Sequence, residues 1–369
     1  MPPASLTAAQ IRREINARAE AYARAHHLLH DLSPGPNPSV IFGRDALGFH
    51  GNFHPESYNR ILAHPDWARR LSKPHTASRR SVARKDWRWM ELDSATSSDA
   101  LLMNIFCHPD VFDDTSLNAP IAALLGTDSA AQPRFGANPG VPLANPLKPR
   151  SKRAAPLEAF DRTEIDLVLS GPTTTLFVEA KLTESDFQTA SPALLSRYRD
   201  LATVFDPDRL RVPHSSRSDG WGVRVSGNQN TPTTPVPHSP RKPGSPSSLL
   251  AGVRSDEWGV SIPHNPENPE PIDPDIPDDF LVSPTPTRER IAGYQLIRNI
   301  LAAHAADAGF CLLLDARRRD LIDIWYAVLS AVRSPSFATR LRVLAWQDLT
   351  PALPTDLRHF LATKYGIES

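Results

Sequence analysis

Cysteine and long apolar runs are scarce in this chain of 369 residues, and each shortage excludes a class of protein. Only Cys107 and Cys311 are present, which excludes a disulfide framework and a cysteine-rich zinc site. No apolar run approaches the length of a membrane-spanning helix, about 18 residues. The first residues are charged and helical in pattern, without the hydrophobic segment of a secretory signal. We therefore expect a cytoplasmic protein with no membrane partner.

An excess of charge of either sign is also lacking, because 41 basic residues balance 41 acidic ones. This balance excludes a uniformly basic coat for nucleic acid, so any basic surface must be local. Lysine is the rare cation, with seven lysines against 34 arginines. A lysine in a defined pattern is therefore informative in this chain.

Proline is abundant, with 37 residues, and it is unevenly placed. Sixteen prolines lie between Pro207 and Thr287, among many Ser, Thr, Asn and Asp residues. Such a segment buries too little apolar surface to offset its ordering entropy, so we predict a long, largely irregular insertion. The predicted organisation has four parts: a helical, basic and aromatic N-terminal region at 1–90, a first core part at 91–206, the insertion at 207–287 and a second core part at 288–369.

Outside the insertion, short apolar stretches alternate with segments of helical periodicity. This alternation predicts an α/β fold with a layered sheet. Helices are expected at residues 7–30, 55–72, 97–106, 191–204, 288–306, 320–332 and 354–365. Strands are expected at residues 164–170, 175–182, 310–314 and 341–346.

Charged side chains interrupt two of these apolar strands, 164–170 and 175–182, which a short turn at Pro172-Thr173 joins into a hairpin. A turn centred there places Asp166 opposite Glu179, and paired residues of antiparallel strands project from the same face. Lys181 shares that face because side chains alternate along a strand. Two carboxylates and one ammonium group are therefore expected to converge.

Such a cluster suits a metal-dependent phosphoryl site. Two adjacent carboxylates repel and tend to hold a proton or a cation, and Mg²⁺ (or Mn²⁺) is bound through one or two carboxylates and phosphate oxygens. Lys181 would orient or deprotonate the attacking water, or neutralise charge on the phosphate. The alternative is a salt bridge on a solvated sheet face. Against it, this is the chain's only acid-x-Lys triplet, although arginine is the common cation.

The pattern of Asp166, twelve intervening residues and Glu179-x-Lys181 resembles the PD-(D/E)XK nuclease superfamily. Further blocks are similar to a bacterial restriction-endonuclease group within it: Gly51–Tyr58, Ser97–Phe106, Lys181–Glu184 and Tyr294–Asn299. The resemblance implies a restriction-endonuclease-like fold, a central mixed sheet flanked by helices, here with a helical N-terminal extension and the proline-rich insertion. It also implies a Mg²⁺-dependent deoxyribonuclease. The proline that often precedes the first acid is replaced by Ile165.

The resemblance also implies roles for individual residues. Asp166, Glu179, Lys181 and Gln295 would be catalytic, with Asp166 and Glu179 as metal ligands. A third acid often comes from upstream, and Glu91 and Asp99 are both candidates. Glu184, Arg298, Asn299 and Asp99 would support the site. Among the 13 histidines no pair has convincing zinc spacing, and His54, in an unusual turn, is the one whose role is worth following.

Basic clusters favour DNA as the partner. The densest runs from Arg69 to Arg88 and includes Arg70 and Lys73, a second precedes the hairpin, and a third is Arg317–Arg319. The alternative is a solvated basic linker. We expect phosphate contacts from Arg79, Arg80, Arg84, Lys85, Lys152 and Arg153.

Three functions remain open from the sequence. The leading one is a metal-dependent DNA nuclease acting in restriction, defence or repair. A second is an inactive module that keeps the fold and binds DNA, and a third is a small-molecule metallophosphoesterase. The sequence also leaves open a homodimer or a partner subunit.

Overall fold

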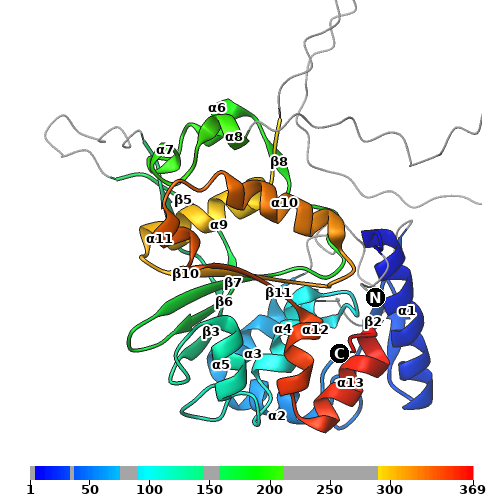
Figure 1. The fold of residues 1–369 in the computed structure, drawn as a ribbon. Helices are drawn as coiled ribbons and strands as arrows, with labels where there is room; N and C mark the ends of the chain where they lie inside the picture. Colours follow the sequence, from blue (N-terminus) through cyan, green and yellow to red (C-terminus); the bar gives the residue numbers. More distant parts are fainter. Residues whose placement is uncertain (1–4, 34–36, 75–89, 145–157, 211–289, 369) are drawn as a thin grey trace, which may run out of the picture. The chain divides into compact units, whose positions relative to one another are not determined.

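The computed structural model describes residues 5–33, 37–74, 90–144, 158–210 and 290–368 (Figure 1). The chain divides into two units, residues 1–215 with 288–369 and residues 216–287, and all described residues belong to the first. Most of the predicted insertion at 207–287 therefore lies outside the described residues. Its first four residues form the short helix α8 (Pro207–Leu210), whose Leu210 is buried. No helix in the described ranges is long and apolar enough to cross a membrane.

A five-stranded mixed sheet forms the centre of the first unit, with the strand order β11-β10-β7-β6-β3 (Figure 1). Strands β3, β6 and β7 pair antiparallel, whereas β7, β10 and β11 pair parallel. This sheet with its helices agrees with the predicted α/β class and is compatible with a restriction-endonuclease-like fold. The strands are β3 (Gln132–Ala137), β6 (Ile165–Ser170), β7 (Thr175–Ala180), β10 (Gly309–Leu314) and β11 (Leu341–Ala345).

Helices cover both faces of the sheet, each with its own hydrophobic core (Figure 1). Helices α1, α2, α4, α5 and α13 share one core with Leu167 and Val178, so the N-terminal helices belong to the same core as the sheet. Helices α9 and α10 share the other core with Val168 and Phe177. The bounds are α1 (Ala8–Ala25), α2 (Pro55–Ala63), α4 (Ser98–Phe106), α5 (Ala119–Leu125), α9 (Tyr294–Ala305), α10 (Arg319–Ser330) and α13 (Thr355–Tyr365).

The β6–β7 hairpin has the register that the sequence predicts. Leu167 pairs with Val178, and the pairing continues to Ser170 and Thr175 at the turn. The alternation of side chains is also confirmed, because Val178 and Phe177 enter the cores on opposite faces. The face of Phe177 is the one that α9 covers.

Smaller elements connect these layers. They are β1 (His30–Leu32), β2 (Val40–Phe42), α3 (Pro65–Ala68), η1 (Arg69–Ser72), η3 (Glu91–Asp93), β4 (Gly140–Pro142), β5 (Phe160–Arg162), β8 (Thr189–Ala190), α6 (Pro192–Leu195), α7 (Leu201–Val204), β9 (Ile291–Ala292), α11 (Pro335–Ala338), α12 (Trp346–Leu349) and η4 (Thr350–Ala352).

Several predicted helices are shorter than expected, for identifiable reasons. The helix predicted at 7–30 ends at Ala25, because His27 adopts the left-handed conformation (φ 54°) that ends many helices. The one at 55–72 breaks before Pro65, which cannot continue the backbone ladder of a helix. The helix predicted at 191–204 is interrupted between α6 and α7. There Ala144 N–H donates to Arg197 O, and Arg199 N–H donates to Pro142 O. The predicted helix at 288–306 begins only at Tyr294, after β9.

The Gly51–Tyr58 segment is a buried polar connector. Asn52 is fully buried, and its Nδ2 donates hydrogen bonds to Leu92 O (2.6 Å) and Ser94 O (2.9 Å). Its Oδ1 accepts a hydrogen bond from Lys364 Nζ of α13 (2.6 Å). Asn104 of α4 donates to Asn52 O at 3.2 Å. The Asn52 side chain thus holds the backbone at residues 92–94. Asn104 of α4 and Lys364 of α13 also bind Asn52.

Replacement of Asn52 by alanine should therefore destabilise the protein. The change removes three hydrogen bonds to buried groups, those of Leu92 O, Ser94 O and Lys364 Nζ. A buried group that is left unsatisfied costs about 1–3 kcal/mol. We expect the free energy of unfolding to fall by about 2–4 kcal/mol in denaturant titrations. Asn138→Ala, at an exposed asparagine, is the control and should change it by less than about 0.5 kcal/mol. Equal stability of the two variants would contradict this role of Asn52.

Candidate active site

The structure brings Asp166, Glu179 and Lys181 together at the edge of the sheet where β6 begins and β7 ends. Glu179 and Lys181 are buried, and Asp166 is half-buried. Lys181 Nζ lies 2.8 Å from Glu179 Oε1. Asp166 Oδ2 accepts the backbone N–H of Ala180 at 2.8 Å. The strand ladder ends at Leu167 and Val178, and the Asp166 side chain takes the next backbone donor.

Two side chains of helix α9 bind the ion pair between Glu179 and Lys181. Gln295 Nε2 donates to Glu179 Oε1 (2.7 Å), and its Oε1 accepts from Lys181 Nζ (2.9 Å). Asn299, one turn further on, donates to Glu179 Oε2 (2.8 Å) and accepts from Thr163 Oγ1 (2.6 Å). The predicted Gln295 and Asn299 thus both contact Glu179. Because a carboxylate has about four acceptor positions, Oε2 keeps one position for a further ligand.

Burial and charge shift the protonation of all three groups. Burial raises the pKa of Asp166 well above its usual range, and the charges of Glu179 and Asp99 raise it further. Burial also raises the pKa of Glu179, although Lys181 opposes this. For Lys181 burial lowers the pKa, but the charges of Glu179, Glu184 and Asp166 outweigh it, so its pKa is raised. Lys181 is therefore a cation in this state of the protein.

The two upstream acids have different surroundings. Asp99, in the first turn of α4, is buried, pairs with Arg70, and its charge raises the pKa of both Asp166 and Glu179. Glu91 pairs with Lys73 at 3.1 Å, and burial together with the charge of Asp99 raises its pKa. Asp99 is thus the acid whose charge acts on the predicted ligand pair.

The predicted metal ligands Asp166, Glu179 and Glu91 do not form a preassembled group of three. Within the described part of the chain, the group of three ligand atoms within 4.8 Å of one another is His54, His108 and Asp356. Each of these carboxylates has a separate partner: Ala180 N–H for Asp166, Lys181 for Glu179 and Lys73 for Glu91.

Glu184 connects the lysine strand to α4. Its Oε1 accepts from Ser98 Oγ and its Oε2 from the backbone N–H of Leu182, both at 2.7 Å. Glu184 and Ser98 also line a cavity of about 180 Å³, together with Arg12, Glu91, Ser94, Thr96, Ser97 and Thr183. This cavity adjoins Glu184, whose charge acts on Lys181.

Arg298 is not part of the cluster. Its Nε lies 3.4 Å from Asp161, and its guanidinium group lies over the ring of Tyr294. In the basic cluster at Arg317–Arg319, Arg319 is exposed and the other two arginines have acidic partners within the protein. Arg317 pairs with Asp315 and Glu14, and the buried Arg318 pairs with Asp320. The predicted DNA contacts Arg79, Arg80, Arg84, Lys85, Lys152 and Arg153 lie outside the described residues.

Sequence reasoning missed the cations that hold the acids. Arg70 and Lys73, expected to be part of a DNA track, both bind Glu164 Oε1, at 2.8 and 2.7 Å. Arg70 crosses β3 at Gly136, which has φ 63°, and a Cβ there would lie 2.0 Å from Arg70 Nη1. Only glycine leaves room for this contact. The positive run at 69–73 was visible in the sequence, but its acidic partners are distant in the chain.

Comparison with known proteins gives one family. The family model described as "Restriction Endonuclease associating with ARP" matches residues 16–220 and 278–366, which is more than half of the chain. The first segment contains the β6–β7 hairpin and the second contains α9. No curated protein and no solved structure matches the chain. By the extent of this match, the chain belongs to the family of restriction endonucleases associating with ARP.

Proposed function

We propose that this protein is a metal-dependent deoxyribonuclease that hydrolyses phosphodiester bonds in defence against foreign DNA. One observation carries the proposal: Asp166 lies beside the buried Glu179–Lys181 ion pair in a chain of a restriction-endonuclease family. Burying such a cluster is costly, and replacing it by apolar residues of similar size is often neutral or stabilising. Its presence is therefore explained better by chemistry than by stability.

The donor set fits a hard divalent cation such as Mg²⁺ or Mn²⁺. Asp166 and Glu179 would be its protein ligands. As the third acid we favour Asp99 over Glu91, because the charge of Asp99 raises the pKa of both ligands. Burial is the main cause of the raised pKa values of Asp166 and Glu179, so their ionised forms would be stabilised by additional positive charge. A bound cation would supply that charge, polarise a phosphoryl oxygen and lower the pKa of a water molecule.

Lys181 is proposed to stabilise negative charge that develops on the scissile phosphate. A buried ammonium group with a raised pKa is a poor general base but a fixed positive charge in a site that excludes water. Gln295 keeps Lys181 beside Glu179, since its amide binds one group with its oxygen and the other with its nitrogen. Glu184 is proposed to orient the strand that carries Lys181.

The description of the family names an association with ARP. We carry this to the chain as a proposal: the nuclease works with a partner subunit or as a homodimer. DNA-binding residues would come from the predicted basic segments at 79–85 and 152–153.

The first test is cleavage of supercoiled plasmid and of linear DNA with Mg²⁺ or Mn²⁺. Wild type should cut, and EDTA should stop it. Glu179→Gln and Lys181→Met should each lower the rate by at least about a hundredfold, because each removes a charge at the reacting phosphate. The matched control is Glu158→Gln, at an exposed glutamate, which should cut like wild type. Full activity of Glu179→Gln would refute the proposal.

The second test concerns Gln295 as a positioning residue. Gln295→Met keeps the length of the side chain but removes both hydrogen bonds to the ion pair. Loss of such an outer contact typically costs about 10–100-fold, so the single-turnover rate at saturating DNA should fall by that factor. DNA affinity should stay unchanged, and Gln132→Met, at an exposed glutamine of β3, is the control. A change in affinity alone would instead place Gln295 in DNA binding.

A further inference from the structure

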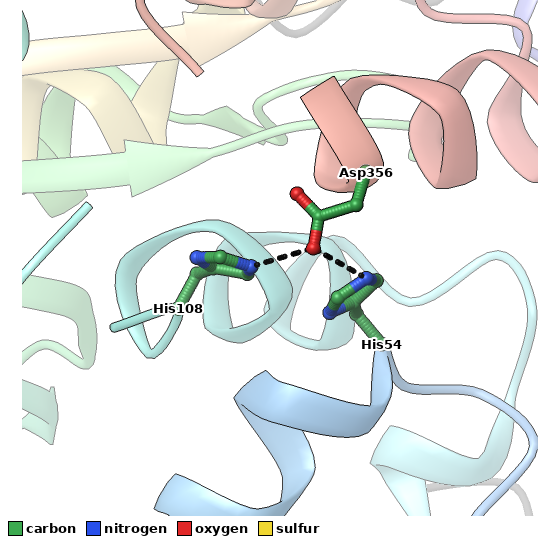
Figure 2. A group of neighbouring side chains, drawn as sticks. All are labelled: His54, His108 and Asp356. Carbon is green, nitrogen blue, oxygen red and sulfur yellow. Dashed lines mark ion pairs between the residues drawn. The ribbon is translucent and has the colours of Figure 1, made fainter. Parts of the chain in front are cut away.

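A second cluster of metal-binding side chains lies on the other side of the sheet from α9. His54 precedes α2, His108 follows α4, and Asp356 lies in the first turn of α13 (Figure 2). Their ligand atoms all lie within 4.8 Å of one another, and Figure 2 shows both rings directed at the same Asp356 oxygen. His54 Nε2 lies 3.5 Å from this oxygen and His108 Nε2 lies 3.6 Å from it.

A second carboxylate lies beside one member of this group. Glu56 Oε2 lies 3.4 Å from His108 Nε2, although Glu56 is not within 4.8 Å of all three ligand atoms. The side chain of His108 is fully buried, whereas those of Asp356 and Glu56 are about half exposed (51% and 54%). The cluster therefore has a rigid inner side and an outer side through which an ion can enter.

The distances are wrong for hydrogen bonds and right for a shared ion. Nitrogen–oxygen hydrogen bonds are about 2.7–3.2 Å long, and His108 Nε2 has no hydrogen-bond partner although it is buried. The edge of a tetrahedron around a zinc ion with bonds of about 2.0–2.1 Å is about 3.3 Å. The nitrogen–oxygen separations of 3.5 and 3.6 Å from the two histidines to Asp356 are close to that edge.

We propose that His54, His108 and Asp356 form a binding site for a transition-metal ion, of which Zn²⁺ is the best match. Imidazole nitrogen with carboxylate oxygen suits Zn²⁺, whereas Mg²⁺ prefers an all-oxygen octahedral shell. The ion joins the start of α2, the end of α4 and the start of α13. The site is separate from the Asp166–Glu179–Lys181 cluster, so it does not depend on the proposed nuclease activity.

Binding changes the tautomer of His108. Its Nδ1 accepts the backbone N–H of Asp110 at 3.2 Å, so in the metal-free protein the proton of a neutral ring is on Nε2. A cation on Nε2 requires that proton on Nδ1, and the Asp110 contact then opens. This exchange distinguishes metal binding from a merely structural role of the histidines.

The test uses the full-length protein in the Asp166→Asn background, which removes one ligand of the other candidate site. After treatment with EDTA and dialysis, Zn²⁺ is titrated calorimetrically and Co²⁺ binding is followed by its visible spectrum. We expect one Zn²⁺ per chain, a tetrahedral Co²⁺ spectrum, and a shift of the His108 ring proton from Nε2 to Nδ1 in ¹⁵N NMR. Bound Zn²⁺ should also raise the melting temperature.

Variants make the assignment specific. Asp356→Asn, at an exposed position, should lower Zn²⁺ affinity at least tenfold, and His108→Gln with His54→Gln should abolish stoichiometric binding. The control His359→Gln, at an exposed histidine of α13, should bind like its parent. Absence of Zn²⁺ binding at about 10⁻⁴ M would overturn the proposal. A Zn²⁺ affinity that neither Asp356→Asn nor the double histidine variant changes would also overturn it.

Discussion

The ion pair between Glu179 and Lys181 is buried, and the surrounding elements are arranged so that its polar atoms have partners. Strand β7 supplies Glu179, and Lys181 directly follows its last residue. Strand β6 supplies Asp166 beside them, and α9 contacts the pair through Gln295 and Asn299. An unpaired buried charge costs several kcal/mol, so loss of any of these contacts would be expensive. The mixed sheet and the packing of α9 against it are thus what make the charged cluster tolerable.

Two cations, Arg70 and Lys73, bind the acidic residues near the pair. Arg70 binds Asp99 and Glu164, and it passes over Gly136 of β3. Lys73 binds Glu91 and Glu164. The connector built on Asn52 fixes the backbone after Glu91, and Asn104 fixes α4, which carries Asp99.

The sequence predicted the parts of this arrangement that depend on local rules. The two-residue alternation and the turn at Pro172-Thr173 set the hairpin register, and the helix predicted at 97–106 is α4. Strand β3 was missed because its residues lack apolar alternation, and its pairing with β6 is what makes it a strand. The Arg70 contacts and the approach of Asp356 to His54 join residues far apart in the chain, which no local pattern encodes.

Asp166→Asn tests most directly whether the buried cluster exists for chemistry. The variant removes one of two repelling carboxylates and leaves an oxygen to accept the Ala180 N–H. Melting temperature and Mg²⁺-dependent DNA cleavage should be measured on the same preparation. A nuclease site predicts an equal or higher melting temperature with cleavage lost. A melting temperature lower by several degrees with cleavage retained would show that Asp166 serves stability, and would contradict the account.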